Sequence, residues 1–92
     1  MAKLDIRFQG VFEGIAQRKN EVLELTSPSL ATVVTALGRL YGRRFSHMVW
    51  DDSRMLRAGV SVLVNGQPRD REAPLQEGDE VLFLTPLGGF HG

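Results

Sequence analysis

The chain has 92 residues, no cysteine, and eleven basic residues balanced by eleven acidic ones. This length predicts one small domain in which a deep catalytic cleft is hard to build, and the lack of cysteine excludes disulfides, cysteine metal sites and a cysteine nucleophile. The zero net charge argues against a nucleic-acid partner, and the lack of an apolar leader or membrane-length apolar run predicts a soluble, cytoplasmic protein without a membrane partner.

The first third of the chain predicts two paired strands. Leu4, Ile6 and Phe8 alternate with polar residues, which indicates a strand with one buried face. Residues 21–25, Glu-Val-Leu-Glu-Leu, are a plausible second strand, and we expect it to pair antiparallel with the first. Between them, Phe12-Glu13-Gly14 and the polar residues 17–20 predict a turn.

A helix follows these strands. We expect Ser27 to cap it, with Pro28 at the first helical position, and Gly42 to end it. Between these limits, apolar residues recur at intervals of three and four and form one stripe, namely Leu30, Val33, Val34, Leu37, Leu40 and Tyr41. Residues 43–58 fit neither period and predict a short irregular helix or a structured loop.

The last third predicts three more strands. The β-branched run 60–64 is followed by the turn pair Asn65-Gly66, and residues 67–69 can form only a short edge strand because Pro68 lacks a backbone donor. Leu75 is a predicted buried anchor, and 80–84 is the final strand. The order predicts a mixed sheet packed on one main helix, in which the first and last strands run parallel if both are central.

The polar residues offer little catalytic chemistry. His47 and His91 have no third ligand at a suitable spacing, so we predict no metal site. The carboxylates of the adjacent pair Asp51-Asp52 are expected to point apart, and we assign the pair to a loop or cap. Charge is uneven, with five arginines in 39–57 and five acidic residues in 69–80. These segments are either solvated faces or a polarised docking surface.

An ordered series of short motifs occupies residues 62–89. Val-Leu-Val-Asn-Gly at 62–66 is followed by Leu-Gln-Glu-Gly-Asp-Glu-Val at 75–81, and a proline then precedes the diglycine Gly88-Gly89. Each motif alone is weak, but the ordered set resembles the second half of MoaD/ThiS-type sulfur carriers. The resemblance implies an α+β, ubiquitin-like β-grasp fold over residues 1–87, with 88–92 as a flexible tail.

The resemblance also implies a function. Family members are carriers rather than enzymes and bind no cofactor of their own. A separate E1-like adenylating enzyme uses ATP and Mg to activate the terminal glycine carboxylate, which becomes a thiocarboxylate. A sulfur-accepting synthase, such as one making molybdopterin or thiazole, then receives the sulfur. Gly89 would carry the acyl group, and Gly88 would lie beside it in a channel that only a glycine backbone can enter.

The chain departs from this family pattern at its end. Phe90, His91 and Gly92 follow the diglycine, so Gly89 has no free carboxylate. We predict that a tail-processing protease removes these three residues. The alternatives are that Gly92 itself is used, that carriage has been lost, or that the three residues are a remnant of a tag.

The last strand also suggests a docking surface. We predict that Leu82, Phe83, Leu84 and Leu87 contact the partner, although helices and the 45–58 segment could instead cover both faces of this strand. Two other functions stay open, a ubiquitin-like protein modifier and a non-covalent β-grasp binding module. In the binding module, Gly88 and Gly89 could be changed without loss of function.

Overall fold

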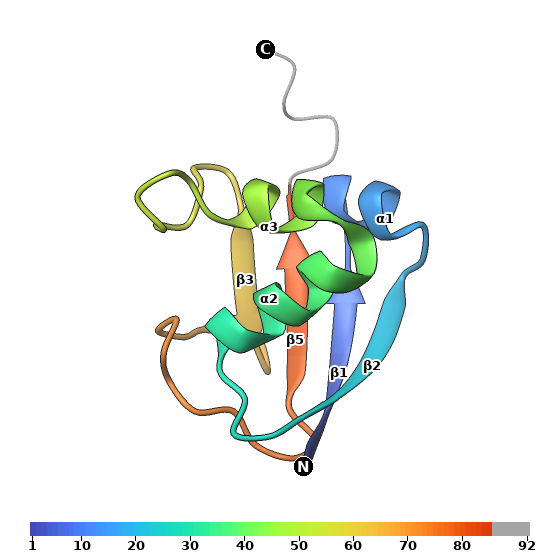
Figure 1. Cartoon of the computed structure of the whole chain (residues 1–92), viewed down its shortest axis with the longest axis vertical. Coiled ribbons are helices and arrows are strands. Elements are labelled where there is room, and N and C mark those ends of the chain that lie inside the picture. The colour runs from blue at the N-terminus through green and yellow to red at the C-terminus, as the bar shows by residue number, and fades with distance from the viewer. Residues whose placement is uncertain (86–92) are drawn as a thin grey trace.

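The computed structural model describes residues 1–85, and these residues form one mixed sheet and three helices (Figure 1). In chain order the elements are β1 (Ala2–Phe8), α1 (Val11–Ala16), β2 (Asn20–Leu25), α2 (Leu30–Tyr41), α3 (Arg43–Val49), β3 (Ser61–Val64), β4 (Gln67–Pro68) and β5 (Glu80–Leu84). None of the helices in this part of the chain is long and apolar enough to cross a membrane.

The strands lie in the order β2-β1-β5-β3-β4. β1 pairs antiparallel with β2 and parallel with β5, and the last strand is therefore central in the sheet. β5 also pairs antiparallel with β3, whose hairpin to β4 turns at Asn65 (φ 53°) and Gly66 (φ 84°). The predicted hairpin, edge strand and parallel central pair are all confirmed.

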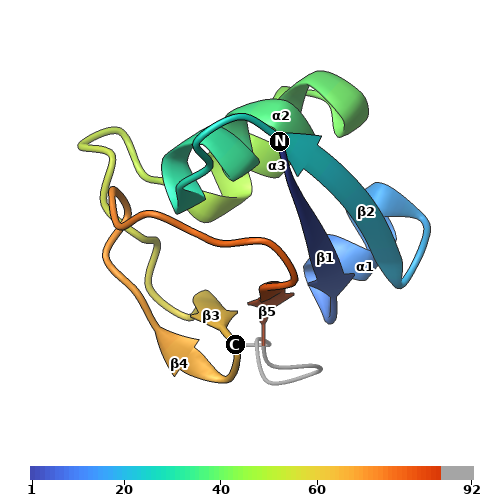
Figure 2. The ribbon, with the colours of Figure 1, turned by 90° about the horizontal axis from the view of Figure 1, so that it is seen from below.

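The helices α2 and α3 cover one face of the sheet and leave the other face open (Figure 2). Strand residues alternate between the two faces, so that Leu4, Ile6 and Phe8 are buried while the residues between them are not. Four phenylalanines form the centre of the core, with ring centroids 5.1–6.3 Å apart for the contacting pairs, namely Phe8, Phe12, Phe45 and Phe83. The predicted anchor Leu75 is also buried.

The prediction that residues 12–20 are a turn was wrong over its first half, because Val11–Ala16 forms the helix α1. Its sequence, Val-Phe-Glu-Gly-Ile-Ala, contains a glycine and begins after Gly10, which has no side chain to cap it. The helix is stabilised by burial of Phe12 and Ala16 in the core. Local sequence gave no sign of it, since six residues are too few for a clear helical period.

The predicted start of α2 was also wrong by two residues. Ser29 is the cap, and it forms a capping box with Thr32 in which each side chain accepts from the other residue's backbone N–H. Ser27 instead has a positive φ of 48°, while the Pro28 carbonyl accepts a bond from Leu75 N–H at 2.8 Å. The start of the helix is therefore set by contact with the distant 69–79 loop. The predicted end at Gly42 is confirmed.

The segment 43–58, which was predicted as a short helix or structured loop, contains both. α3 covers Arg43–Val49 and buries Phe45 and Val49. A loop then follows, closed by a bridge between Trp50 and Leu56. The Asp51 carboxylate accepts from two backbone N–H groups of this loop, at 2.8 and 3.0 Å, which gives it a structural role as predicted.

Candidate functional site at the end of the central strand

The central strand β5 ends at Leu84, and the next residue, Thr85, is the last described residue and is held by contacts with the start of α1. Thr85 is fully buried although it is polar. Its hydroxyl oxygen accepts a hydrogen bond of 2.8 Å from Val11 N–H, which is an orphan donor in the first turn of α1. One hydrogen bond therefore ties the end of β5 to the start of a helix 74 residues earlier in the chain.

Gly10 makes this contact sterically feasible. Its φ of +67° lies in a region that residues with a side chain rarely adopt, and a Cβ there would overlap both the hydroxyl and the carbonyl oxygen of Thr85. Just before it, Gln9 N–H donates to the Phe83 carbonyl at 2.9 Å. The position and direction of the chain at residue 85 are thus fixed from the β1–α1 connection.

The open face of the sheet carries an apolar strip beside this point. Leu82 and Leu84 of β5 are half-buried there, and Leu63 of β3 lies directly opposite Leu82 in the pairing register. Figure 2 shows that α2 and α3 lie on the other side of the sheet. Leu82 and Leu84 were among the predicted docking residues, but Leu63 was not, although its alternation with Val62 and Val64 indicates the same kind of half-exposed position.

One predicted docking residue is wrong. Phe83 has no exposed surface and packs against the rings of Phe8, Phe12 and Phe45, so it belongs to the core. The error came from naming consecutive residues of a strand, whose side chains point to opposite faces.

A small ion cluster flanks the apolar strip on its β1 side. The Arg7 guanidinium lies 3.1 Å from the Asp5 carboxylate and 3.4 Å from that of Glu80, and Arg7 is paired with Leu82 across the strands. These side chains are exposed, so the cluster adds little to stability. An apolar strip edged by charges is a common form of protein-binding surface.

Other candidate residues do not gather into a site. In residues 1–85 no three His, Asp or Glu side chains lie close enough to hold a metal ion, and His47 is an exposed residue of α3. The predicted tail residues, namely Leu87, Gly88, Gly89, Phe90, His91 and Gly92, lie outside the described residues. What the structure does describe is the position from which the tail departs.

The model of the ThiS family matches residues 6–89. No curated protein sequence matches the chain.

Solved structures with low sequence identity share the fold. Small archaeal modifier protein 1 from Haloferax volcanii has a TM-score of 0.81 at 17% identity, covering 95% of this chain and 100% of that one. A putative molybdopterin converting factor, subunit 1, from Pyrococcus furiosus has a TM-score of 0.75 at 18% identity, with coverages of 95% and 100%. A small archaeal modifier protein 1 from Methanosarcina acetivorans has a TM-score of 0.78 at 18% identity, with coverages of 97% and 97%.

Proposed function

This chain belongs to the ThiS family, and from that premise we propose that it is a sulfur carrier activated at Gly89 by an E1-like adenylating enzyme. The predicted family is confirmed, as is the ubiquitin-like β-grasp fold that the structural neighbours share. Family and fold together support a ubiquitin-like carrier or modifier role. The attachment residue, the thiocarboxylate and the activating partner are the proposed refinements.

The observation that supports the proposal most directly is the range of residues that the family match covers. It runs through Gly88 and Gly89 and stops before Phe90. This extent agrees with attachment at Gly89 after a protease has removed residues 90–92. In the activation step the Gly89 carboxylate attacks the α-phosphorus of ATP and releases pyrophosphate. A sulfur donor supplied by the partner system then displaces AMP from the acyl carbon.

The described structure supports a passive part for this chain in that chemistry. The partner would supply ATP, magnesium and all catalytic groups, because adenylation already creates the leaving group. The chain would supply a surface for the partner to bind, namely the apolar strip of Leu63, Leu82 and Leu84. It would also supply a fixed position, at Thr85, from which the tail begins. The sulfur acceptor would be a synthase that engages the same carrier afterwards.

Intact mass of the protein isolated from its own cells tests the proposal. We expect loss of residues 90–92 and, in part of the sample, a gain of about 16 Da where sulfur replaces oxygen. A chain that always ends at Gly92, without thiocarboxylate or conjugate, would contradict it and favour the non-covalent binding module.

Three chains compared in vitro provide a second test of attachment at Gly89. A chain ending at Gly89 should support ATP–pyrophosphate exchange by the adenylating enzyme of the same organism. The chain ending at Gly92 and the Gly88→Ala variant of the shorter chain should not. Equal exchange by all three would show that the diglycine is not the attachment site.

A second function rests on the solved structures named as small archaeal modifier proteins. In that function the activated Gly89 carbonyl is attacked by a lysine amine of a target protein, so that an amide forms and AMP leaves. Peptides that carry a Gly-Gly remnant on lysine, found after proteolysis of cell extract, would favour the modifier function over sulfur transfer.

A further inference from the structure

An open groove is lined by residues of α1 and α3 together with Arg57. Figure 1 shows these two helices at the end of the sheet where β5 ends. One of its lining residues, Val11, is the residue whose N–H donates to Thr85. The groove therefore begins at the departure point of the tail, but in the helical layer rather than on the open face. Its lining residues are Val11, Ile15, Arg43, Arg44, His47, Met48 and Arg57.

Every ionisable side chain that lines the groove is basic. Arg43, Arg44 and Arg57 have no carboxylate within 4.0 Å among residues 1–85. The Arg57 guanidinium donates to the His47 carbonyl, which holds its charge against α3. The groove thus presents positive charge that the described protein does not itself neutralise.

The groove also has apolar walls. Val11 is 42% exposed, and Ile15 and Met48 are partly buried against the core. A polyphosphate or nucleic acid would contact the arginines but gain nothing by covering these side chains. A protein segment with both carboxylates and apolar side chains would use the whole surface, because interfaces bury apolar contacts at their centre and place complementary charge at the rim.

We propose that this groove is a second docking surface and that its occupant is an acidic, partly apolar segment of the activating enzyme. The inference rests on the proposed function, since it names a further contact with the same partner. An enzyme that contacts both the open strip and the groove would hold Thr85 from two sides, and the chain would enter the adenylation site in one direction.

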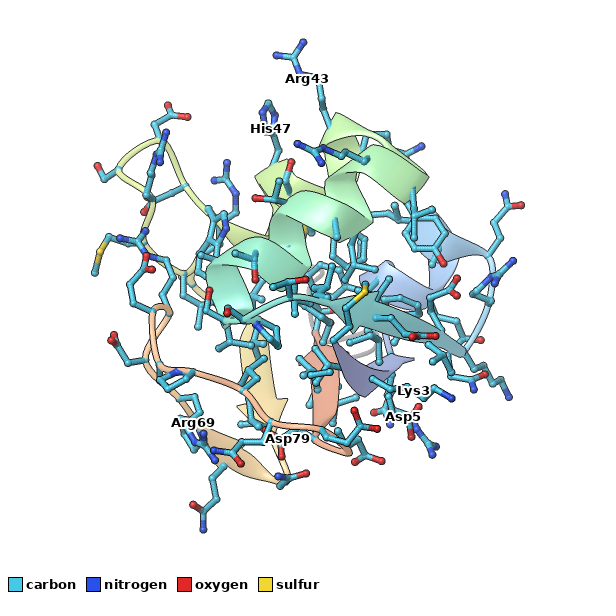
Figure 3. The ribbon with its side chains drawn as sticks, turned by 60° about the horizontal axis from the view of Figure 1, so that its bottom comes forward. Lys3, Asp5, Arg43, His47, Arg69 and Asp79 are labelled. Atoms are coloured by element: carbon cyan, nitrogen blue, oxygen red, sulfur yellow. The ribbon has the colours of Figure 1, made fainter. Side chains whose placement is uncertain are left out.

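The matched variants Arg43→Glu and Arg69→Glu test this surface. Both side chains are exposed, and Figure 3 shows Arg43 beside His47 on α3 and Arg69 on the opposite side of the molecule. The measurement is steady-state ATP–pyrophosphate exchange with the activating enzyme, using chains that end at Gly89. Far-UV circular dichroism should show both variants folded.

For Arg43→Glu we expect a KM for the carrier about 5- to 20-fold higher at low ionic strength, with kcat changed less than about twofold. Arg69→Glu should stay close to the unaltered chain. The difference should shrink in about 0.5 M salt, where exposed charges are screened. Val11→Ser should raise KM by about threefold at any salt concentration, since it removes apolar contact.

The outcomes separate the two proposals. If the unaltered chain supports no exchange at all, the proposed function fails. If it supports exchange and Arg43→Glu and Arg69→Glu share its KM, only the groove inference is overturned. Saturable shifts of the α3 amide resonances with sodium tripolyphosphate, but not with a peptide of alternating glutamate and leucine, would also overturn it in favour of a phosphate ligand.

Discussion

The two faces of β5 carry residues of similar chemistry but different roles. Val81, Phe83 and Thr85 are buried beneath the helical layer, whereas Leu82 and Leu84 are half-buried on the face that no described helix covers. The first set holds the domain together, and the second is available to a partner. An apolar residue in this strand therefore acquires its role from the face to which it points and not from its type.

The largest difference between the two faces is expected when the loss of stability in Phe83→Ala is compared with that in Leu82→Ala. Phe83 contacts three other rings at centroid distances of 5.2–6.3 Å, and its loss should lower the free energy of unfolding by about 3–5 kcal/mol. Leu82→Ala should cost about 1 kcal/mol because the side chain is only half-buried. Urea denaturation followed by circular dichroism measures both, and equal losses would contradict the division between the faces.

Gly10→Ala tests the contact with Thr85, which follows the buried face of β5. Alanine must adopt a φ of +67° and also displace the Thr85 oxygens, so we expect a loss of about 2–4 kcal/mol. The matched control is Gly42→Ala, which has a φ of +96° but open space around its Cβ, and which should cost about 1–2 kcal/mol. Thermal unfolding of the two variants would show no difference if the Thr85 contact were unimportant.

Leu82→Ser and Leu84→Ser test the open face. Each should lower stability by about 1–2 kcal/mol, well below the loss expected for Phe83→Ala, yet raise the KM of the carrier for the activating enzyme on the order of tenfold. Val22→Ser is the control, since Val22 is exposed on the same face but lies in the edge strand β2. An effect of Val22→Ser as large as that of Leu82→Ser would mean that the partner surface is not centred on β5.

The smallest expected effect on stability concerns Tyr41, a partly buried residue that packs against the core. Burial raises the pKa of Tyr41 to about 12, and its hydrogen bond to the Glu21 carboxylate, at 2.7 Å, adds to the shift. The folded state thus holds the proton more tightly than the unfolded state, in which the pKa is about 10. The resulting stability is present below pH 10 and lost as pH rises towards 12.

Tyr41→Phe should remove this alkaline component of the stability curve. Because the chain has one tyrosine, tyrosinate absorbance titrates Tyr41 alone. A midpoint near pH 10 in the folded protein would show that neither burial nor the Glu21 hydrogen bond raises the pKa of Tyr41.

Much of the fold followed from local patterns. The alternation of Leu4, Ile6 and Phe8 predicted β1, the turn pair Asn65-Gly66 predicted the β3–β4 hairpin, and the ordered motifs of residues 62–89 predicted the family. These features succeed because each depends on residues close together in the chain.

The candidate site was predicted less completely. The docking prediction named consecutive residues of the last strand, and the sequence does not say which face of that strand the helices cover. Phe83 was therefore included in error, and Leu63, which belongs to another strand, was missed. The basic groove was also missed as a unit, because α1 was not predicted and Arg43 and Val11 are distant in sequence.

The sequence by itself determined the strand alternation, the main helix, the hairpin turn, the family and the absence of cysteine chemistry. Only the tertiary structure decided that α1 forms, that α2 begins at Ser29, and that the end of β5 is fixed. Each of these depends on a hydrogen bond or bridge between distant residues, such as Val11 to Thr85 or Ser29 to Pro74. Such contacts form only when the sheet brings their partners together, so a pattern of neighbouring residues does not contain them.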